Sequence, residues 1–543
     1  MNNGGSSEER YKLTGVHRAE NTDDEKTDKE LMELFGEDKK PKSTPMFKRQ
    51  AKDIVIAVAL FVLTVLGVSA LFWDSMSAGY TLTFIAFMIA VSVYLISKKS
   101  IFTPFSIVCA VLSVACSISF AVTSNLSVRL ISLLITSVSS VVWYSHLAGN
   151  KYEVKDFGAL EYAALPMIHS VSDMPRAVLS LFSKRESDSK TVKRIFIGAA
   201  CALPLLLITI PILMHSDDAF YYLVSGANNS IKDVVAKTLT ALLFIPFVLG
   251  FVFSIKHKKY EKEKTVGLRT INPVTVSAFL CVSSLVYIVY LFSQLAYFTS
   301  GFMNILPEGY KFTYAQFARQ GFFELCVLAA INLTVLIMTV VLTRKEEEKL
   351  PLSVKIPATF IALFTILIIS TSISKMVMYI REYGMTLLRV CTSAFMIWMA
   401  VMFIAVIFRI YMKKLDMTAV GLISSLVIIS VLGIFNVNSF VARYNYEAYT
   451  GSGVTIDVDY MSKLGDEGVK YLYELTHDKN QAVASEAKKA LDAKTKYYFD
   501  TTSKDEDDKG DKKTERKYSG IGQFSFAREE AYTYMEKFMK EIK

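Results

Sequence analysis

Long apolar stretches recur along this chain and leave few folds open to it. A helix needs about 20 mostly apolar residues to cross the hydrocarbon of a bilayer, because that layer is about 30 Å thick and each helical residue rises about 1.5 Å. The stretches that qualify are Ile54 to Trp73, Gly79 to Ser97, Phe102 to Thr123, Leu126 to Leu147, Ile195 to Met214, Thr238 to Ile255, Val274 to Gln294, Gly321 to Thr343, Lys355 to Ser374, Thr386 to Ile410 and Thr418 to Val437. The sequence therefore predicts an all-α integral membrane protein with about eleven transmembrane helices.

The positive side chains of the loops predict how these helices are oriented. Short loops rich in Lys and Arg are retained on the cytoplasmic side of a membrane. With a cytoplasmic amino terminus, the inner flanks hold 26 Lys and Arg residues and the outer loops hold 8. An odd number of crossings then places everything after Val437 outside the cell. Arg129 lies within one turn of the outer end of its span, where a long side chain can reach the headgroups.

Composition divides the membrane part of the chain further. Residues 1–50 are polar and are expected to form a disordered cytoplasmic tail. Residues 51–147 hold four predicted spans, and residues 195–437 hold seven. Between them, the cytoplasmic loop 148–194 combines apolar and basic side chains, which predicts an amphipathic segment on the inner leaflet or a helix packed under the bundle. Whether the first four spans pack with the last seven is open.

The carboxyl-terminal segment, residues 438–543, is expected to be a small helical domain outside the membrane. Helix-forming residues and apolar spacing predict short helices near residues 466–475 and 482–493 and a final amphipathic helix from about Phe526 to Ile542. Residues 503–517 are almost wholly charged, with both signs mixed, and are expected to be a solvated linker.

Motif content excludes several chemistries. All six cysteines lie in apolar stretches, so no disulfide framework is expected, and the sequence has no CxxC pair. It also has no GxxxxGK[ST], GxSxG or HExxH motif. No cofactor and no metal site is predicted, and whether the protein is an enzyme is open. The net charge of +9 follows from the cytoplasmic loops, so no nucleic-acid partner is expected.

Several strings resemble a known family. They are QLAYFTSGFMNILPEGYKFTYAQFARQGFFEL from Gln294, YIREYGMTLLR from Tyr379, FVARYNYEAY, IDVDYMSKLGDEGVKYL, HSDDAF from His215 and the closing GQFSFAREEAY. These strings are similar to a bacterial membrane family catalogued only as a domain of unknown function, numbered 4173, with a sister group numbered 4153. The resemblance implies a multipass protein of the bacterial cell membrane with no assigned activity.

On the predicted topology, charged residues of these strings and their surroundings fall on the outer face. We hypothesise that they converge into one ligand-binding pocket, because charges at a membrane boundary need partners. Its residues are Asp217, Asp218, Arg319, Glu324, Arg381, Glu382, Tyr383, Arg389 and Arg443. The alternative is that they form interfacial belts and helix-end pairs that only hold the bundle together.

Three function classes follow. The sequence favours an envelope scaffold or sensor, which needs no missing motif and would meet the bilayer and an envelope lipid or protein at its outer face. An enzyme acting on an outer-leaflet lipid or an envelope polymer is one alternative, and a facilitator or flippase is another. The centres of the predicted spans carry no Asp, Glu, Lys, Arg or His, which disfavours a proton-coupled pump.

Overall fold

The computed structural model describes residues 46–47, 50–73, 76–150, 158–182, 229–257, 271–293, 322–344, 350–412, 415–506, 512–518 and 523–542, with residues 209, 212, 213 and 216. Among these residues, ten helical segments are long and apolar enough to span a membrane. They are α3 (Ala51–Phe72), α4 (Ala78–Leu95), α5 (Pro104–Ser117) with α6 (Ser119–Val122), α7 (Leu126–Leu147), α11 (Asn229–His257), α12 (Pro273–Ser293), α15 (Phe322–Leu342), α16 (Leu352–Tyr383), α17 (Leu387–Tyr411) and α18 (Met417–Ile434).

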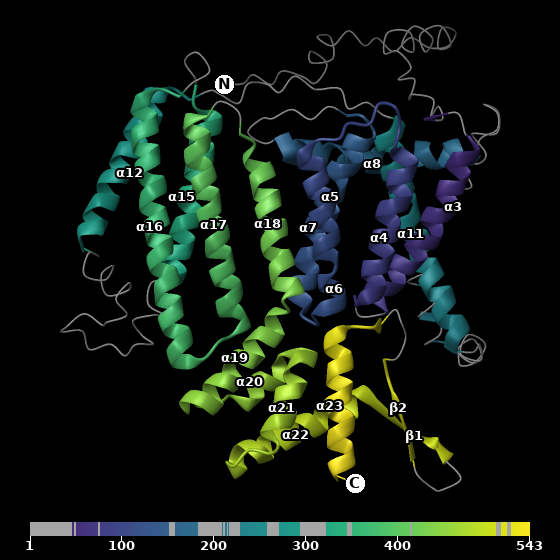
Figure 1. The fold of residues 1–543 in the computed structure, drawn as a ribbon. Helices are drawn as coiled ribbons and strands as arrows, with labels where there is room; N and C mark the ends of the chain where they lie inside the picture. Colours follow the sequence, from purple (N-terminus) through teal and green to yellow (C-terminus); the bar gives the residue numbers. More distant parts are fainter. Residues whose placement is uncertain are drawn as a thin grey trace, which may run out of the picture. The chain divides into compact units, whose positions relative to one another are not determined.

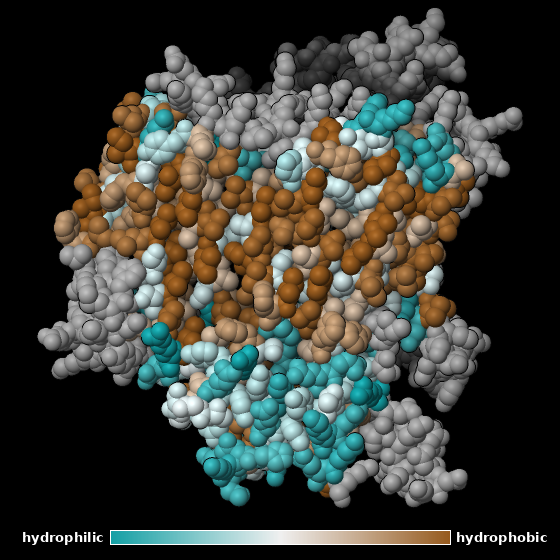
Figure 2. Space-filling view, viewed as in Figure 1, coloured by the Kyte–Doolittle hydropathy of each residue, from teal (hydrophilic) through white to brown (hydrophobic). Residues whose placement is uncertain are grey.

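These helices confirm the prediction of an all-α multipass membrane protein. They match ten of the eleven predicted spans, and the other, Ile195 to Met214, falls almost wholly outside the described residues. Large apolar side chains face outward along them: Val289 is 70% exposed and Phe292 is 75% exposed. Figure 2 shows the resulting apolar band across the helices. Such a surface suits lipid, since a soluble protein rarely exposes a large continuous apolar patch.

Two apolar cores hold the membrane helices together. One joins α12, α15, α16 and α17, and the other joins α3, α4, α7 and α11. Helix α18 packs against α17 and also against α5 and α7, so it links the two groups (Figure 1). The first four spans therefore pack directly with later ones, a question that the sequence left open.

The loop after α7 contains a further helix, α8 (Gly158–Phe182), which packs mainly against α11. Gly250 of α11 allows this close approach, because a Cβ there would lie 2.7 Å from the carbonyl oxygen of Ser170. Asp416 holds the start of α8: one carboxylate oxygen accepts from the Ala159 amide at 2.6 Å, while the other caps α18. The helix still exposes Ile168 on its other face, so it is both packed against the bundle and amphipathic.

Helix α16 is longer than predicted. It continues from the expected end at Ser374 to Tyr383 and stops at Gly384, whose φ of 72° favours glycine. Arg381, Glu382 and Tyr383 therefore form the last turn of α16 and do not begin the following span. The hydropathy pattern predicted an end at Ser374 because the polar residues after it lower the mean hydropathy, but these residues still form helix.

The carboxyl-terminal domain follows α18. It consists of α19 (Val437–Ser452), α20 (Val458–Lys463), the 3-10 helix η1 (Gly465–Gly468), α21 (Val469–Leu475), α22 (Gln481–Tyr498), β1 (Phe499–Glu506), β2 (Lys512–Arg516) and α23 (Phe526–Ile542). The final helix has its predicted bounds. Where the charge pattern predicts a solvated linker, β1 and β2 pair antiparallel, with Phe499 opposite Arg516. Figure 1 shows this domain below one end of the membrane helices, with α8 across the other.

Candidate functional site

The structure places six of the nine residues predicted to form an outer pocket. Asp217, Asp218 and Arg319 lie outside the described residues. Glu324 is exposed in the first turn of α15. The three neighbours at the end of α16, residues 381–383, are exposed as well.

Arg389 and Arg443 have local partners. The guanidinium of Arg389 donates to the carbonyl oxygen of Tyr383 at 3.1 Å and to that of Gly384. It also lies 4.0 Å from the centre of the Tyr379 ring. Arg389 thus closes the end of α16, as positive groups do at helix carboxyl termini. Arg443 pairs with Glu447 at 2.7 Å on an exposed face of α19. Convergence of the nine residues into one pocket stays a prediction.

A different set of charges is buried where the carboxyl-terminal domain meets the membrane helices. We call it the junction cluster, and its members are Arg129, Asp466, Glu467, Lys494, Tyr498 and Arg528. They come from α7, η1, α22 and α23. Both carboxylates and both arginines are less than a tenth exposed. Charges so deeply buried need partners, because removing them from water is costly.

Glu467 binds the loop between α6 and α7. Its carboxylate accepts from the Ser124 amide at 2.7 Å, from the Thr123 hydroxyl at 3.2 Å and from the Ser124 hydroxyl. Next to it, the Asn125 side chain caps α7 and donates to Asn438 at 2.9 Å. We call these contacts the Glu467 clasp. Charged acceptors form the stronger class of hydrogen bond, so the clasp fixes η1 against the membrane helices.

Gly465 makes this approach possible. Its φ is 76°, in the left-handed region that other residues rarely adopt. A Cβ at this position would also collide with the Ser124 hydroxyl. The backbone of η1 can therefore turn directly beneath the loop, and the ammonium of Lys494 donates to the Gly465 carbonyl at 3.0 Å. Burial lowers the pKa of Lys494, while Asp466 and Glu467 act in the opposite direction.

The other half of the cluster surrounds a cavity of about 350 Å³. Asp466 accepts a hydrogen bond from the Tyr498 hydroxyl, and its other oxygen lies 3.5 Å from Nε of Arg528. Burial and Asp466 raise the pKa of Tyr498, so the phenol stays protonated and donates. Arg129 lines the same cavity and donates to the Phe120 carbonyl at 3.1 Å. It is 4% exposed and does not reach outward to headgroups as its position in the sequence suggested.

Sequence reasoning missed the junction cluster, although three of its six residues stood in the quoted strings. Asp466 and Glu467 lie in IDVDYMSKLGDEGVKYL, and Arg528 lies in GQFSFAREEAY. Hydropathy treats such residues as solvated because they follow the last span. The signal that could have found them was the single arginine of the fourth span, which needs a carboxylate or carbonyl partner at a membrane boundary.

Comparison with known protein families finds a match for this chain. Residues 83–475 are similar to the family described as a domain of unknown function, DUF4153, which is the sister group named on the sequence motifs. The match begins in the second span, earlier than the motifs did, and ends with α21. It thus includes the loop and the glutamate of the Glu467 clasp. No curated protein matches the chain. No solved structure matches it either.

Proposed function

We propose a role from the geometry of the chain itself, because the chain belongs to the protein family described as a domain of unknown function, DUF4153, and that description assigns no activity. The protein is an envelope scaffold or sensor of the bacterial cell membrane. Its membrane helices carry a carboxyl-terminal helical domain on the outer side, and the position of that domain follows the arrangement of the helices. The observation that carries this proposal is the Glu467 clasp, in which a buried carboxylate joins two parts of the chain that lie 343 residues apart.

Further contacts extend the coupling to other helix ends. The Asn445 side chain of α19 accepts from the Met385 amide at 2.7 Å and donates to the Met385 carbonyl at 2.8 Å, in the connection between α16 and α17. At the first residue of α4, the Ala78 amide donates to the Phe524 carbonyl at 2.9 Å. One domain therefore bonds to the start of α4 and to the connections α6–α7 and α16–α17, and it continues α18 directly. Movement of any of these helices would strain the domain contacts, which is what a sensor of the bundle requires.

The same contacts support the proposed sidedness. The helix ends that bond to the domain are those that the Lys and Arg pattern assigns to the outer face. The opposite ends carry α8 and the basic flanks, among them Lys98 and Lys99. We assign the amino terminus and α8 to the cytoplasm and the domain to the outside on this ground. Labelling of an introduced cysteine, Ser485→Cys, in intact cells with an impermeant reagent tests it: reaction is expected, and protection until lysis would overturn the assignment.

Coupling itself is tested by disturbing the bundle and observing the domain. Gly433 of α18 packs against Ser119 of α6, and a Cβ at Gly433 would collide with that side chain. A Cβ at Gly451 in α19 would meet nothing within 4 Å, so this glycine supplies a matched control. In bilayer nanodiscs, we expect Gly433→Ala, and not Gly451→Ala, to accelerate amide hydrogen exchange in residues 465–475. Equal exchange in the two variants would refute a domain that responds to the helices.

A further inference from the structure

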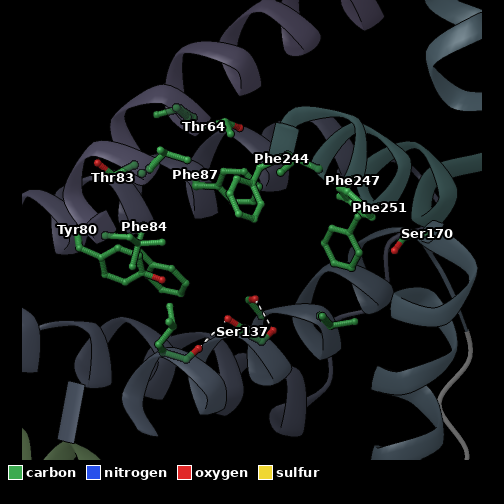
Figure 3. A pocket seen from close by; sticks show the side chains of 18 of the residues that line it. Thr64, Tyr80, Thr83, Phe84, Phe87, Ser137, Ser170, Phe244, Phe247 and Phe251 are labelled. Carbon is green, nitrogen blue, oxygen red and sulfur yellow. Dashed lines mark hydrogen bonds between the residues drawn. The ribbon is translucent and has the colours of Figure 1, made fainter. Parts of the chain in front are cut away.

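An apolar chamber lies within the membrane part, where five helices pack in a ring. Helix α3 packs on α4, α4 on α7, α7 on α8, α8 on α11 and α11 on α3. The chamber between them has a volume of about 450 Å³, within the range of about 300–1,000 Å³ common for ligand pockets. Figure 3 shows aromatic rings around it, among them those of Phe87, Phe244 and Phe251. The chamber is thus large enough for a ligand and is surrounded mainly by carbon.

The chamber is also long. On α7, the residues that line it extend from Leu133 to Tyr144. Eleven residues of helix at about 1.5 Å per residue correspond to about 16 Å. The hydrocarbon of a bilayer is about 30 Å thick, so this length is about that of one leaflet. A single lipid chain therefore matches the chamber in length.

One end of the chamber lies beside the carboxyl-terminal domain. Tyr80, in the first turn of α4, lines the chamber at this end. Two residues earlier, the Ala78 amide donates to the Phe524 carbonyl of the domain at 2.9 Å. At the other end, Ser170 of α8 lines the chamber. The chamber thus extends from the helix ends beside the domain toward α8.

Most hydroxyl groups in the wall are already satisfied. Thr64, Thr83, Ser137 and Ser170 each donate to a carbonyl of their own helix, at 2.7, 2.8, 2.7 and 2.6 Å. Ser140 does the same at 2.8 Å. These hydroxyls do not require a ligand as acceptor, so the greater part of the wall is apolar in character. It suits an alkyl chain better than a polar solute or an ion.

Tyr80 is the exception. Its side chain is only 8% exposed, and its hydroxyl forms no hydrogen bond within the part of the chain that the structure describes. Figure 3 shows the Tyr80 ring pointing into the chamber. Tyr144, by comparison, donates to Sδ of Met88 at 3.1 Å. A buried hydroxyl without an acceptor costs free energy, so the ligand that fits best carries an acceptor at the level of Tyr80.

The wall favours a neutral acceptor. None of the described residues that line the chamber is charged. A carboxylate in the chamber would have no positive partner there, which is costly in apolar surroundings. The carbonyl oxygen of an ester accepts a hydrogen bond without carrying a charge. In a glycerolipid this carbonyl lies where the chain meets the headgroup, and Tyr80 lies at the corresponding level, near the end of its span.

We propose that the chamber binds one acyl chain of a membrane glycerolipid and that Tyr80 donates a hydrogen bond to the ester carbonyl of that chain. The chain lies between α3, α4, α7 and α11, and the headgroup lies on the side of the carboxyl-terminal domain. This lipid site goes beyond the proposed sensor role and does not rest on it, because the binding is measured without reference to the domain.

The test titrates lipids onto the full-length, delipidated protein and counts bound lipids by native mass spectrometry. The probes are a diacyl phosphatidylcholine, the dialkyl ether phosphatidylcholine with chains of the same length, and the free fatty acid. We expect the diacyl lipid to bind about fivefold more tightly than the ether lipid, as the loss of one hydrogen bond predicts. The fatty acid should bind more weakly than the diacyl lipid. Equal binding of the ester and ether lipids, or tighter binding of the fatty acid, would overturn the proposal.

Tyr80→Phe isolates the hydroxyl. It keeps the ring, whose centre lies 4.4 Å from that of Phe120, and removes only the donor. The diacyl lipid should bind this variant about fivefold more weakly and lose its advantage over the ether lipid. Tyr411→Phe is the matched control, because Tyr411 is 56% exposed on α17, and it should leave both affinities unchanged. An advantage of the diacyl lipid that persists in Tyr80→Phe would refute the hydrogen bond.

Gly67→Leu tests the position of the chain. Gly67 lines the chamber, and a Cβ there would have only an ordinary contact, 3.6 Å from Thr83. The leucine should occupy part of the chamber and weaken binding of both lipids about tenfold or more. Gly421→Leu is the control, since Gly421 lies on α18 and its Cβ would have an ordinary contact, 3.7 Å from Met402. Unchanged binding in Gly67→Leu, or an equal loss in Gly421→Leu, would refute a chain in the chamber.

Discussion

Truncation of Glu467 should release the carboxyl-terminal domain from the membrane helices. The carboxylate is 6% exposed and accepts from three donors of residues 123 and 124. Glu467→Ala removes all three bonds and leaves the partly buried Ser124 amide without its acceptor. The Thr123 and Ser124 hydroxyls can rotate to other acceptors, so the loss of free energy comes chiefly from the unpaired amide and from the charge-assisted bond to it. Together these give about 3 kcal/mol.

The Ser124 amide itself provides the assay. It donates to Glu467 and takes no part in a helix, so its hydrogen exchange measures opening of the clasp. A loss of about 3 kcal/mol corresponds to exchange roughly 150-fold faster. Glu467→Gln keeps an oxygen acceptor and loses the charge, so an acceleration of only about tenfold is expected.

Glu447→Ala is the matched control. Glu447 lies on the same domain in an exposed pair with Arg443, and such pairs contribute about 0–1 kcal/mol. If Glu467→Ala accelerates Ser124 exchange no more than Glu447→Ala does, the clasp does not hold the domain and the reasoning fails.

Three further changes test neighbouring contacts. Asp416→Ala removes the acceptor of the Ala159 amide, so hydrogen exchange at Ala159 should accelerate by the equivalent of about 1–3 kcal/mol. Unchanged exchange would show that Asp416 does not hold the start of α8. Gly465→Ala should destabilise domain docking by at least about 1–2 kcal/mol, because the φ of 76° at this position is unfavourable for alanine. Limited proteolysis should therefore be faster in Gly465→Ala than in Gly451→Ala, and equal rates would contradict this. The Lys494 pKa in the folded protein is below the ordinary 10.5. Between the folded pKa of Lys494 and 10.5, Lys494 is protonated in the unfolded domain and not in the folded one, so resistance to proteolysis should rise with pH in that range. Lys494→Met should abolish the rise. A rise that persists in Lys494→Met would assign it to another group.

The membrane helices could be predicted from the sequence because their signal is local. An apolar run from Leu126 to Leu147 has one stable arrangement in a bilayer, a helix that satisfies its own backbone, and the structure has that helix with the same bounds. The final helix, from Phe526 to Ile542, was likewise readable from its own apolar spacing. Helix α16 was misjudged only at its end, where polar residues continue a helix that a glycine stops.

The partners of buried charges were decided by tertiary structure alone. Nothing near Glu467 in the sequence shows that it bonds Ser124, because the two are brought together by the packing of α18 against α5 and α7. The charged residues of the carboxyl-terminal segment look alike in sequence, yet Arg443 is solvated and Arg528 is buried. Hydrophobic burial acts on each segment by itself and can be read along the chain. The pairing of charges depends on which segments meet, and only the folded molecule supplies that.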